Sequence, residues 1–386
     1  MSQLVASEHQ HRDLSFVIEK ATPMVLRSPI ATPVQTSFGI MTDRPALYLL
    51  LEDTAGNTGI GEVWCNFPAC GAEHRARLLR TAILPVIIGT EFSDPQHCFN
   101  VLRDQFQRLA IQSGEPGPVA QAIAGIDVAL WDLVAKRLEL PLFELFGGQP
   151  EIAVYASGIN PTSAGETLSR CQAAGYNAFK LKIGFGDEID YPNIEQLCAN
   201  LSDGQQLMVD ANQAWTLEQA LQQVPRLRDY PLQWLEEPML ADAPLTHWHT
   251  LAAASAIPLA AGENMDERQT FLDANTDTWL QVMQPDICKW GGFSGVLPVA
   301  KHALANGKRY CPHFLGGGVG LAASAHLLAA VGGDGALEID SNPNPLRESL
   351  FSPPISNGNI SVSTTPGLGI DSQVLSQLCT NPEFTT

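Results

Sequence analysis

Basic residues are scarce in this chain, and that scarcity argues against two classes of partner. Lys and Arg number 22 against 41 Asp and Glu, which gives a net charge of −19 over 386 residues. Nucleic acids and anionic membrane surfaces are bound through clustered positive charge, so we expect neither as a partner. The chain also lacks an uncharged apolar run of the ~18 residues that a membrane span needs. The N-terminal segment MSQLVASEHQHRDLSF has no apolar core of signal length, and these absences together predict a cytoplasmic protein.

Paired cysteine motifs are missing as well. The chain has eight cysteines but no Cys-x-x-Cys pair, which indicates reduced thiols rather than a disulfide framework or a zinc knuckle. Apolar residues, by contrast, make up 45% of the chain. A chain of this length with that much apolar surface can bury a large core and is expected to divide into two domains. The cysteines are Cys65, Cys70, Cys98, Cys171, Cys198, Cys288, Cys311 and Cys379.

Residues 1–145 predict an α+β domain. The runs PALYLLLED and IGEVW flank the turn AGNTG, and this pattern indicates an antiparallel hairpin between residues 16 and 63. From residue 73 the apolar spacing becomes helical, as in Ala122, Ile126, Ala129 and Leu133. The segments 28–44 and 65–73 are expected to form lids that close over a substrate.

Residues 146–345 predict a parallel barrel. Eight short apolar runs follow one another, with helical stretches in the gaps, a pattern typical of a (β/α)8 count. Residues 346–386 contain GNISV and TTPGLGI, do not resemble barrel units, and are expected to return to the N-terminal domain. The eight runs are AVYAS, AFKLKIG, QLMVDAN, QWLEEP, IPLAAGEN, LQVMQPD, RYCPHF and ALEID.

An ionisable residue stands near the end of one predicted strand after another. Successive members of this series are 23 to 28 residues apart, the length of one strand, one helix and two loops. The carboxyl ends of parallel strands meet at one mouth of a barrel, where the active sites of such folds lie. The sequence therefore predicts an active site there. The seven residues are Lys182, Asp210, Glu236, Glu263, Asp286, His313 and Glu338.

Three carboxylates in this series, those of Asp210, Glu236 and Glu263, end consecutive predicted strands. Three hard oxygen ligands without a thiolate or imidazole favour Mg²⁺ or Mn²⁺. Two alternatives remain: the carboxylates cap the helices that follow, or they form a ring of salt bridges with lysines.

Lys180 and Lys182 are two residues apart on one predicted strand, so both point into the barrel if either does. Burying two ammonium groups side by side disfavours the protonation of each, which predicts a lysine neutral enough to accept a proton. The alternative is a solvated pair at the end of the strand.

Asp286 and His313 lie one strand-helix unit apart and are expected to meet across neighbouring strands. A carboxylate bonded to one ring nitrogen fixes the tautomer and raises the basicity of the other, which makes an acid/base catalyst. The glycines of Gly316-Gly317-Gly318 fit either a simple turn or a loop that holds an anion through backbone N–H groups. His9 and His11 have the His-x-His spacing of a metal-binding motif, but the polar sequence around them indicates a terminal tail.

The motifs as a set resemble the enolase superfamily, and within it the mandelate racemase subgroup. The resemblance covers nearly the whole chain and implies a modified (β/α)7β TIM-like barrel with an N-terminal α+β capping domain. It rests on IAGIDVALWDLVAKRLELPLFELFGG, the Lys-x-Lys of AFKLKIGFG, VDANQAW, WLEEP, AAGEN, QPDICKWGGFSG, CPHF and LEID.

The resemblance also implies a role for each residue. It makes Asp210, Glu236 and Glu263 the Mg²⁺ ligands, with Mn²⁺ as an alternative ion. Lys182 would be the base on one face of the substrate and His313 with Asp286 the acid/base pair on the other. Asn212 and Glu338 would hydrogen-bond the substrate, and Lys180 would modulate Lys182 and contact the substrate carboxylate.

The implied activity is abstraction of the proton α to a carboxylate, through an enediolate stabilised by the metal, by Lys180 and by a protonated Glu338. Local similarity to sugar-acid enzymes favours dehydration of an aldonate or aldarate, followed by lactone cycloisomerisation and then racemisation or epimerisation. A catalytically silent binding protein and a zinc hydrolase are less favoured. Lys289-Trp290 departs from the cycloisomerase pattern, so the substrate is not carried over. The expected partners are a small-molecule carboxylate and further copies of the chain.

Overall fold

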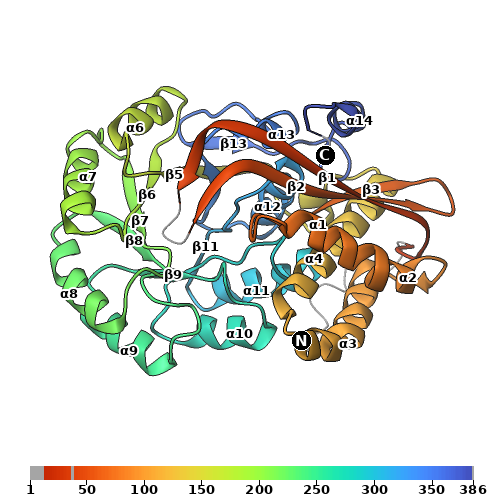
Figure 1. The fold of residues 1–386 in the computed structure, drawn as a ribbon, viewed down its shortest axis with the longest axis horizontal. Helices are drawn as coiled ribbons and strands as arrows, with labels where there is room; N and C mark the ends of the chain where they lie inside the picture. The colour runs from red at the N-terminus through yellow and green to blue at the C-terminus, as the bar shows by residue number, and fades with distance from the viewer. Residues whose placement is uncertain (1–12, 36–38, 385–386) are drawn as a thin grey trace.

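The computed structural model describes residues 13–35 and 39–384, which form a four-stranded antiparallel sheet with helices and, beside it, a barrel. The small sheet has the order β3-β2-β1-β4. Its long arms lie across the top of Figure 1 and reach the barrel. The bounds of the strands are Phe16–Gln35 (β1), Ile40–Asp53 (β2), Thr58–Val63 (β3) and Glu91–Phe92 (β4).

Alternate residues of β2 pack into two different cores. Ala46 and Tyr48 belong to the core shared with the barrel, whereas Leu47, Leu49 and Leu51 belong to the core under the N-terminal helices. Side chains on a strand alternate between its two faces, so a sheet covered on both faces is apolar at every position. The predicted hairpin is confirmed, because β2 and β3 pair antiparallel from Leu47–Val63 to Glu52–Thr58.

The helices of this part are α1 (Gly71–Leu78), η1 (Leu79–Ile83), α2 (Leu84–Ile87), α3 (Pro95–Ser113), α4 (Pro116–Arg137) and α5 (Leu142–Leu145). Helix α3 begins at Asp94, whose carboxylate accepts the N–H of His97, and it ends at the left-handed Gly114. Helix α4 packs tightly on β3, because a Cβ at Gly61 would lie 2.0 Å from the carbonyl oxygen of Gly125. Close approach of strand and helix therefore requires glycine at that position.

Helix α4 is also long and apolar enough to cross a membrane by length and composition alone. In the structure, however, 83% of its apolar window is buried, which is the environment of a core helix.

Eight parallel strands form the barrel, in the order β11-β10-β9-β8-β7-β6-β5-β12. The predicted (β/α)7β arrangement is confirmed, because a helix of nine or more residues follows each of the first seven strands and only a four-residue helix follows the eighth. The strands are β5 (Glu151–Ile159), β6 (Ala178–Lys182), β7 (Gln206–Asp210), β8 (Leu232–Glu236), β9 (Leu259–Ala261), β10 (Val282–Met283), β11 (Arg309–Tyr310) and β12 (Ala336–Asp340). The helices are α6 (Ala164–Ala173), α7 (Asp187–Ala199), α8 (Leu217–Leu227), α9 (Leu245–Ala254), α10 (Arg268–Thr276), α11 (Gly292–Ala305), α12 (Gly318–Val331) and the short α13 (Pro345–Glu348).

The C-terminal segment contacts both parts of the molecule. Strand β13 (Asn359–Ser361) pairs antiparallel with β5, and helix α14 (Ser372–Thr380) follows it. Between these two elements, the N–H of Leu368 donates to Asp132 of α4. After α14, the carbonyl oxygen of Phe384 accepts the N–H of Arg27 in β1. The domain boundaries expected from the sequence, at residues 145 and 345, stay a prediction.

The segment expected as a first lid, residues 28–44, is mostly strand, and its closure over a substrate stays a prediction. Most of it belongs to the paired arms of β1 and β2, which pair from Ser28–Arg44 to Gln35–Ile40 with a register shift between Pro29 and Val34. Thr36, Ser37 and Phe38, at the turn between the arms, lie outside the described residues.

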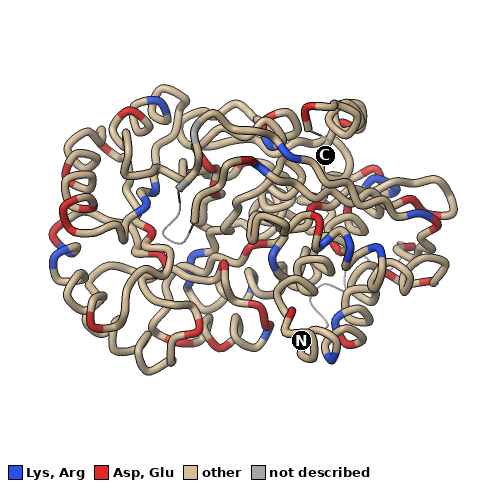
Figure 2. The backbone as a smooth tube through the Cα atoms, viewed as in Figure 1, with Lys and Arg blue, Asp and Glu red and all other residues tan. Residues whose placement is uncertain are grey.

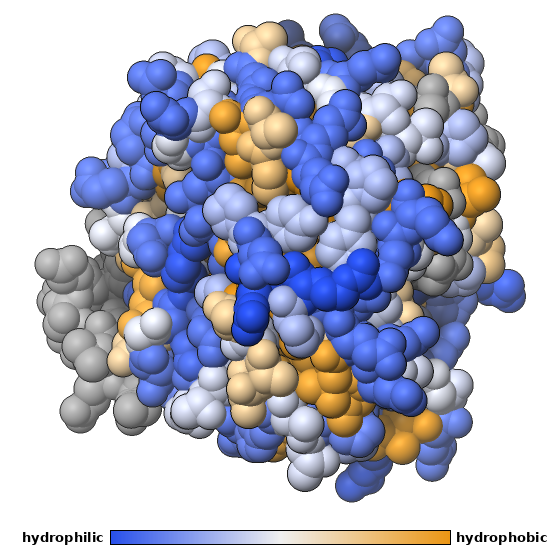
Figure 3. Space-filling view, turned by 90° about the vertical axis from the view of Figure 1, so that its left-hand side faces the viewer, coloured by the Kyte–Doolittle hydropathy of each residue, from blue (hydrophilic) through white to orange (hydrophobic). Residues whose placement is uncertain are grey.

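The outer surface carries the negative charge that the composition predicts. Asp and Glu are spread along the outer helices rather than gathered in one patch (Figure 2). The face formed by the outer barrel helices is largely hydrophilic, and its apolar side chains form separate small groups (Figure 3). All eight cysteines are free, as expected.

Candidate active site

The parallel register aligns the predicted site residues at the carboxyl ends of the strands. Lys182, Asp210 and Glu236 end β6, β7 and β8, and they are register partners in turn. Glu263 follows β9 by two residues, while Asp286 and His313 follow β10 and β11 by three. Glu338 differs slightly, because it lies in the middle of β12. The structure thus brings all seven to one end of the barrel.

Lys180 is fully buried in the barrel, which excludes the alternative of a solvated lysine pair. Its Nζ lies 2.7 Å from Oε1 of Glu236 and 2.8 Å from Oε1 of Glu338. Burial opposes the charge on Lys180, but the charges of Glu236 and Glu338 outweigh burial and raise its pKa well above the usual value.

Glu338 is therefore ionised in this arrangement. Burial would raise its pKa, but the ammonium of Lys180 holds that pKa below its ordinary value. The expectation that Glu338 donates a proton is not met here, because its oxygens accept from Lys180 and from the N–H of Phe314. Neither Lys180 nor Glu338 lines the pocket described below, so their contact with substrate stays a prediction.

Lys182 is held by two neighbours at the end of β7. Its Nζ donates to Asp210 and, at 2.8 Å, to Oδ1 of Asn212. The expectation of a lowered lysine pKa is wrong for this arrangement. Burial and the charge of Lys180 lower the pKa of Lys182, but the charge of Asp210, supported by Glu236 and Glu263, raises it above the usual value.

His313 and Asp286 form the predicted pair. Nδ1 of His313 lies 2.9 Å from Oδ2 of Asp286, and Nε2 contacts Oε2 of Glu263. The other oxygen of Asp286 accepts the N–H groups of Cys288 and Lys289, which fixes the carboxylate. Burial opposes protonation of the imidazole, but the charges of Glu263 and Glu338 raise the pKa of His313 well above its ordinary value. The imidazolium is thus the favoured form in this arrangement.

The three carboxylates expected to bind a metal are each paired with a cationic side chain. Asp210 pairs with Lys182, Glu236 with Lys180 and Glu263 with His313. As placed, no three His, Cys, Asp or Glu side chains in the described ranges 13–35 and 39–384 lie close enough together to hold a metal ion. The capping alternative is excluded, because the N-cap positions of α8, α9 and α10 are occupied by Thr216, Pro244 and Glu267 instead.

The chemistry of this donor set fits a hard divalent cation. Three carboxylates lie on or directly after consecutive strands. Besides burial, the charge of Glu263 acts to raise the pKa of Asp210, and the charge of Asp210 acts to raise the pKa of Glu236. A fourth carboxylate, Glu237, is adjacent, and its buried Oε1 has no hydrogen-bond partner. Buried carboxylates at this density need positive charge to offset their repulsion. In this structure lysine and histidine side chains supply that charge. This is the salt-bridge arrangement that the sequence offered as an alternative to metal binding.

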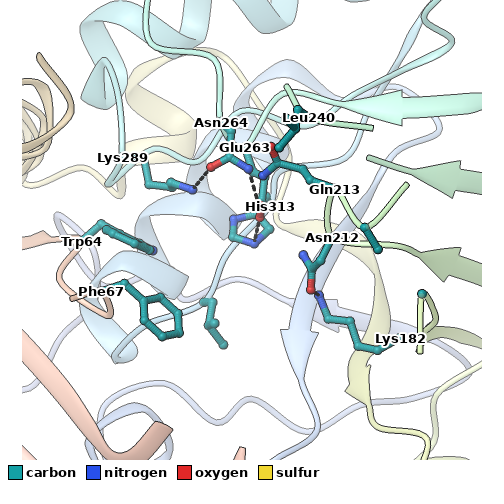
Figure 4. A pocket seen from close by; sticks show the side chains of 13 residues that line it. Trp64, Phe67, Lys182, Asn212, Gln213, Leu240, Glu263, Asn264, Lys289 and His313 are labelled. Atoms are coloured by element: carbon teal, nitrogen blue, oxygen red, sulfur yellow. Dashed lines mark hydrogen bonds and ion pairs between the residues drawn. The ribbon is translucent and has the colours of Figure 1, made fainter. Parts of the chain in front are cut away.

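A cavity of about 590 Å³ opens over these residues (Figure 4). Figure 4 shows Lys182 and Asn212 on one side, Lys289, Trp64 and Phe67 on the other, and His313 with Glu263 between them. Its volume suits a small organic ligand. The lining residues are Trp64, Phe67, Lys182, Gly184, Asn212, Gln213, Ala214, Leu240, Glu263, Asn264, Lys289, His313 and Leu315.

Sequence reasoning did not assign several of these pocket residues. Trp64 and Phe67 come from the N-terminal domain. The predicted lid at 65–73 was the one signal for Phe67, whereas Trp64 ends the run IGEVW that was assigned only to the hairpin. Leu240 and Leu315 lie in loops after β8 and β11, where no strand or helix pattern marks a residue as functional. Beneath the pocket, Gln284 and Trp234 both donate to Oε2 of Glu236, which only the folded barrel reveals.

The glycine loop before α12 does hold an anion through its backbone, and that anion is a side chain of the protein itself. Gly317 N–H donates to Oε1 of Glu62, and Gly320 N–H donates to Oε2 at 2.8 Å. Burial raises the pKa of Glu62 to about 7 although these bonds oppose the shift. Since Glu62 belongs to β3, it ties the N-terminal sheet to the loop that follows His313.

Comparison with known proteins identifies the family. Residues 164–374 match the family described as enolase C-terminal domain-like, and residues 20–147 match the mandelate racemase/muconate lactonizing enzyme N-terminal domain. The chain therefore belongs to the enolase superfamily and is an enzyme of its mandelate racemase subgroup, as the motifs predicted.

Among curated relatives, the D-galactarolactone cycloisomerase of Agrobacterium fabrum is 32% identical over 71% of this chain and 75% of its own length. The arabinonate dehydratase of Saccharolobus solfataricus is 27% identical over 83% of this chain and 86% of its own length.

Two crystal structures are similar to the whole fold. A mandelate racemase/muconate lactonizing enzyme from Bordetella bronchiseptica RB50 shares 47% identity and a TM-score of 0.89, covering 95% of this chain and 99% of that one. A racemase from Streptomyces coelicolor A3(2) with bound magnesium shares 28% identity and a TM-score of 0.82, covering 94% and 99%.

Proposed function

We propose that this enzyme removes the proton α to the carboxylate of an acid sugar and then expels the 3-hydroxyl, which yields a 2-keto-3-deoxy acid. The supporting observation is the arrangement of the pocket. Lys182 and His313 come from different strands and line one cavity together with Glu263, and Asp286 holds His313 from outside that lining. Two proton-transfer groups that flank one cavity suit a reaction in which one proton leaves and another is delivered.

The chain's own residues divide the work as follows. Lys182 accepts the proton from the α-carbon in its neutral form, which would be favoured once a cation held by Asp210 offset the carboxylate charge that raises the pKa of Lys182. Asn212 orients Nζ of Lys182 by accepting a hydrogen bond from it. His313, protonated and held by Asp286, donates a proton to the departing 3-hydroxyl, which leaves as water. The resulting enol becomes the 2-keto acid by tautomerisation, so one substrate gives one keto acid and one water.

Asp210, Glu236 and Glu263 are the residues that would hold Mg²⁺ or Mn²⁺. When bound, the cation offsets the carboxylate charges and stabilises the negative charge that develops on the substrate carboxylate. Gln284 and Trp234 fix the orientation of Glu236 from below. A relative from Streptomyces coelicolor contains magnesium, which supports the choice of ion.

A second candidate reaction is the cycloisomerisation of a sugar-acid lactone. The relative with 32% identity, D-galactarolactone cycloisomerase, favours it. Reprotonation of the enediolate by the opposite group would instead give a racemase or epimerase. We further propose a cytoplasmic homo-oligomer that acts on a small-molecule carboxylate.

The test is a library of aldonates, aldarates and their lactones, incubated with the protein and Mg²⁺. We expect α-keto acid to form, detected with a carbonyl reagent, and solvent deuterium to enter C3 of the product when the enol tautomerises. If no keto acid forms, stereochemical inversion would indicate a racemase or epimerase, and ring isomerisation would indicate a lactone cycloisomerase. The absence of both keto acid formation and deuterium incorporation with every sugar acid would contradict the proposed class.

Metal dependence is tested on the same material. Exhaustive chelation should abolish turnover and Mg²⁺ should restore it. Asp210→Asn should lower the affinity for Mn²⁺ by about tenfold or more, measured by calorimetry, whereas Asp203→Asn, an exposed carboxylate before β7, should not. Unchanged Mn²⁺ affinity in folded Asp210→Asn would remove that residue from the ligand set.

A further inference from the structure

The pocket contains a lysine, Lys289, to which the proposed chemistry assigns no role. It lies in the loop between β10 and α11 and lines the cavity on the side away from Lys182 (Figure 4). Its backbone is fixed, because its N–H donates to both the carboxylate and the carbonyl oxygen of Asp286. The carboxylate that orients His313 therefore also positions Lys289.

The side chain of Lys289 has no acidic partner. Nζ donates to Oδ1 of Asn264 at 2.8 Å and lies 4.8 Å from the centre of the Trp64 ring. Within the described parts of the chain, no carboxylate lies within ion-pair distance of this nitrogen, whereas Lys182 and Lys180 each contact one or more. An ammonium group has three donors, so two remain for a ligand.

The wall around Lys289 suits one end of a polyhydroxylated chain. Trp64 and Phe67 offer apolar ring faces, and Asn212 and Gln213 offer amides on the opposite wall. Although the protein is strongly acidic overall, this cavity is lined by two lysines and a histidine against one carboxylate. A cavity with that balance attracts and holds anions.

We propose that Lys289 binds a second carboxylate of the substrate, at the end of the pocket away from Lys182, and so selects sugar diacids over sugar monoacids. This inference rests on the proposed function, because the first carboxylate must occupy the end near Lys182. The alternative role for Lys289 is purely electrostatic: its charge offsets those of Glu237 and Glu263. The two roles predict different results when Lys289 is replaced. Binding of a second carboxylate predicts that only diacids bind more weakly, whereas an electrostatic role predicts that diacids and monoacids are affected equally.

The test uses galactarate and galactonate, which differ only in a carboxylate or a hydroxymethyl group at the far end. We expect the wild-type protein with Mg²⁺ to bind galactarate about tenfold or more tightly than galactonate, measured by calorimetry. Lys289→Met and Lys289→Gln should remove this preference by weakening galactarate alone. Lys289→Arg should retain part of it, and Lys301→Met, an exposed lysine of α11, should retain all of it.

In steady-state assays Lys289→Met and Lys289→Gln should raise KM for galactarate and leave its kcat nearly unchanged. Both KM and kcat for galactonate should stay nearly the same. The inference is overturned if the wild-type protein shows no preference, if the variants keep it, or if both compounds are weakened equally. The last result would assign Lys289 to the electrostatics of the carboxylates. Absence of both keto acid formation and α-proton exchange with every sugar acid would instead overturn the proposed function, and this inference with it.

Discussion

At the scale of single residues, the site depends on which carboxylate faces which cation. Asp286 accepts hydrogen bonds from two backbone N–H groups and from His313, so its position is set before any ligand binds. Glu263 contacts the other ring nitrogen of the same histidine. The imidazole of His313 thus contacts both its proton-transfer partner, Asp286, and a proposed metal ligand, Glu263.

His313→Asn should lower turnover by about 100-fold or more, because the general acid is lost. Asp286→Asn should have a similar effect, since the imidazole would lose its orienting partner. Both variants should still exchange the α-proton with deuterated solvent through Lys182, a readout measured by NMR. The matched control is His249→Asn, which removes an exposed histidine that also lies 2.8 Å from an aspartate, Asp277. Normal turnover in folded His313→Asn would make this imidazole structural.

At the scale of secondary-structure elements, β3 and α12 meet through one buried carboxylate, Glu62. Its two oxygens accept the N–H groups of Gly317 and Gly320 at the start of the helix. Burial favours the neutral form of Glu62 and raises its pKa, whereas the N-terminus of α12 favours the ionised form and lowers it. The effect of burial is larger, as the pKa raised to about 7 indicates.

The pH dependence of stability follows from that shift. The pKa of Glu62 is higher in the folded protein, about 7 against a reference value of 4.5, so the folded state binds more protons between these values. The contribution of Glu62 to the free energy of unfolding should therefore fall as pH rises from about 4.5 to about 7, by on the order of 3 kcal/mol. Glu62→Gln should remove this dependence.

The measurement is urea unfolding of wild type and Glu62→Gln at pH 5 and pH 8. The variant should be less stable than wild type at pH 5, and the difference should shrink at pH 8. Glu19→Gln, an exposed glutamate of β1, should show a difference that does not change with pH in this way. An equal difference at both pH values for Glu62→Gln would mean that Glu62 titrates at the same pH in folded and unfolded protein.

The elements also show how far the sequence alone could lead. The strand count of the barrel, the β2–β3 hairpin and the alignment of Lys182 with Asp210 followed from local periodicity, which is a property of neighbouring residues. The partner of the glycine loop did not, because Glu62 and Gly317 are 255 residues apart and no local pattern links them. The prediction of a lowered pKa for Lys182 was wrong for the same reason, since the charges around this lysine come from four strands that are far apart in the sequence.

At the scale of the whole molecule, a buried ion cluster joins the N-terminal hairpin to the last barrel strand. Arg44 of β2 contacts Asp340 of β12 at 2.6 Å, and Arg347 of α13 contacts the same oxygen at 3.4 Å. All three residues are buried. Burial would raise the pKa of Asp340, but the two guanidinium groups hold it below its ordinary value.

Arg44→Met should lower the free energy of unfolding by on the order of 3 kcal/mol, because the carboxylate of Asp340 would lose its nearest partner while it stays buried. Thermal or urea unfolding at neutral pH measures this, and Arg77→Met, an exposed arginine of α1, serves as the control. Because the pKa of Asp340 is lowered on folding, the stabilisation by the intact cluster should be present at neutral pH and fade as pH falls below about 4. Equal stability of Arg44→Met and Arg77→Met would contradict the role of the cluster.

Strand β2 sends alternate side chains to two cores, and this limits how the chain can vary in length. Inserting one residue between Ala46 and Leu51 would exchange the two faces, so that the side chains of each core would be offered to the other. Small and bulky residues would then be mismatched on both sides at once. Natural variation in length should therefore be tolerated in the turn at residues 54–57, where Thr54, Ala55 and Gly56 are exposed, and avoided along the strand itself.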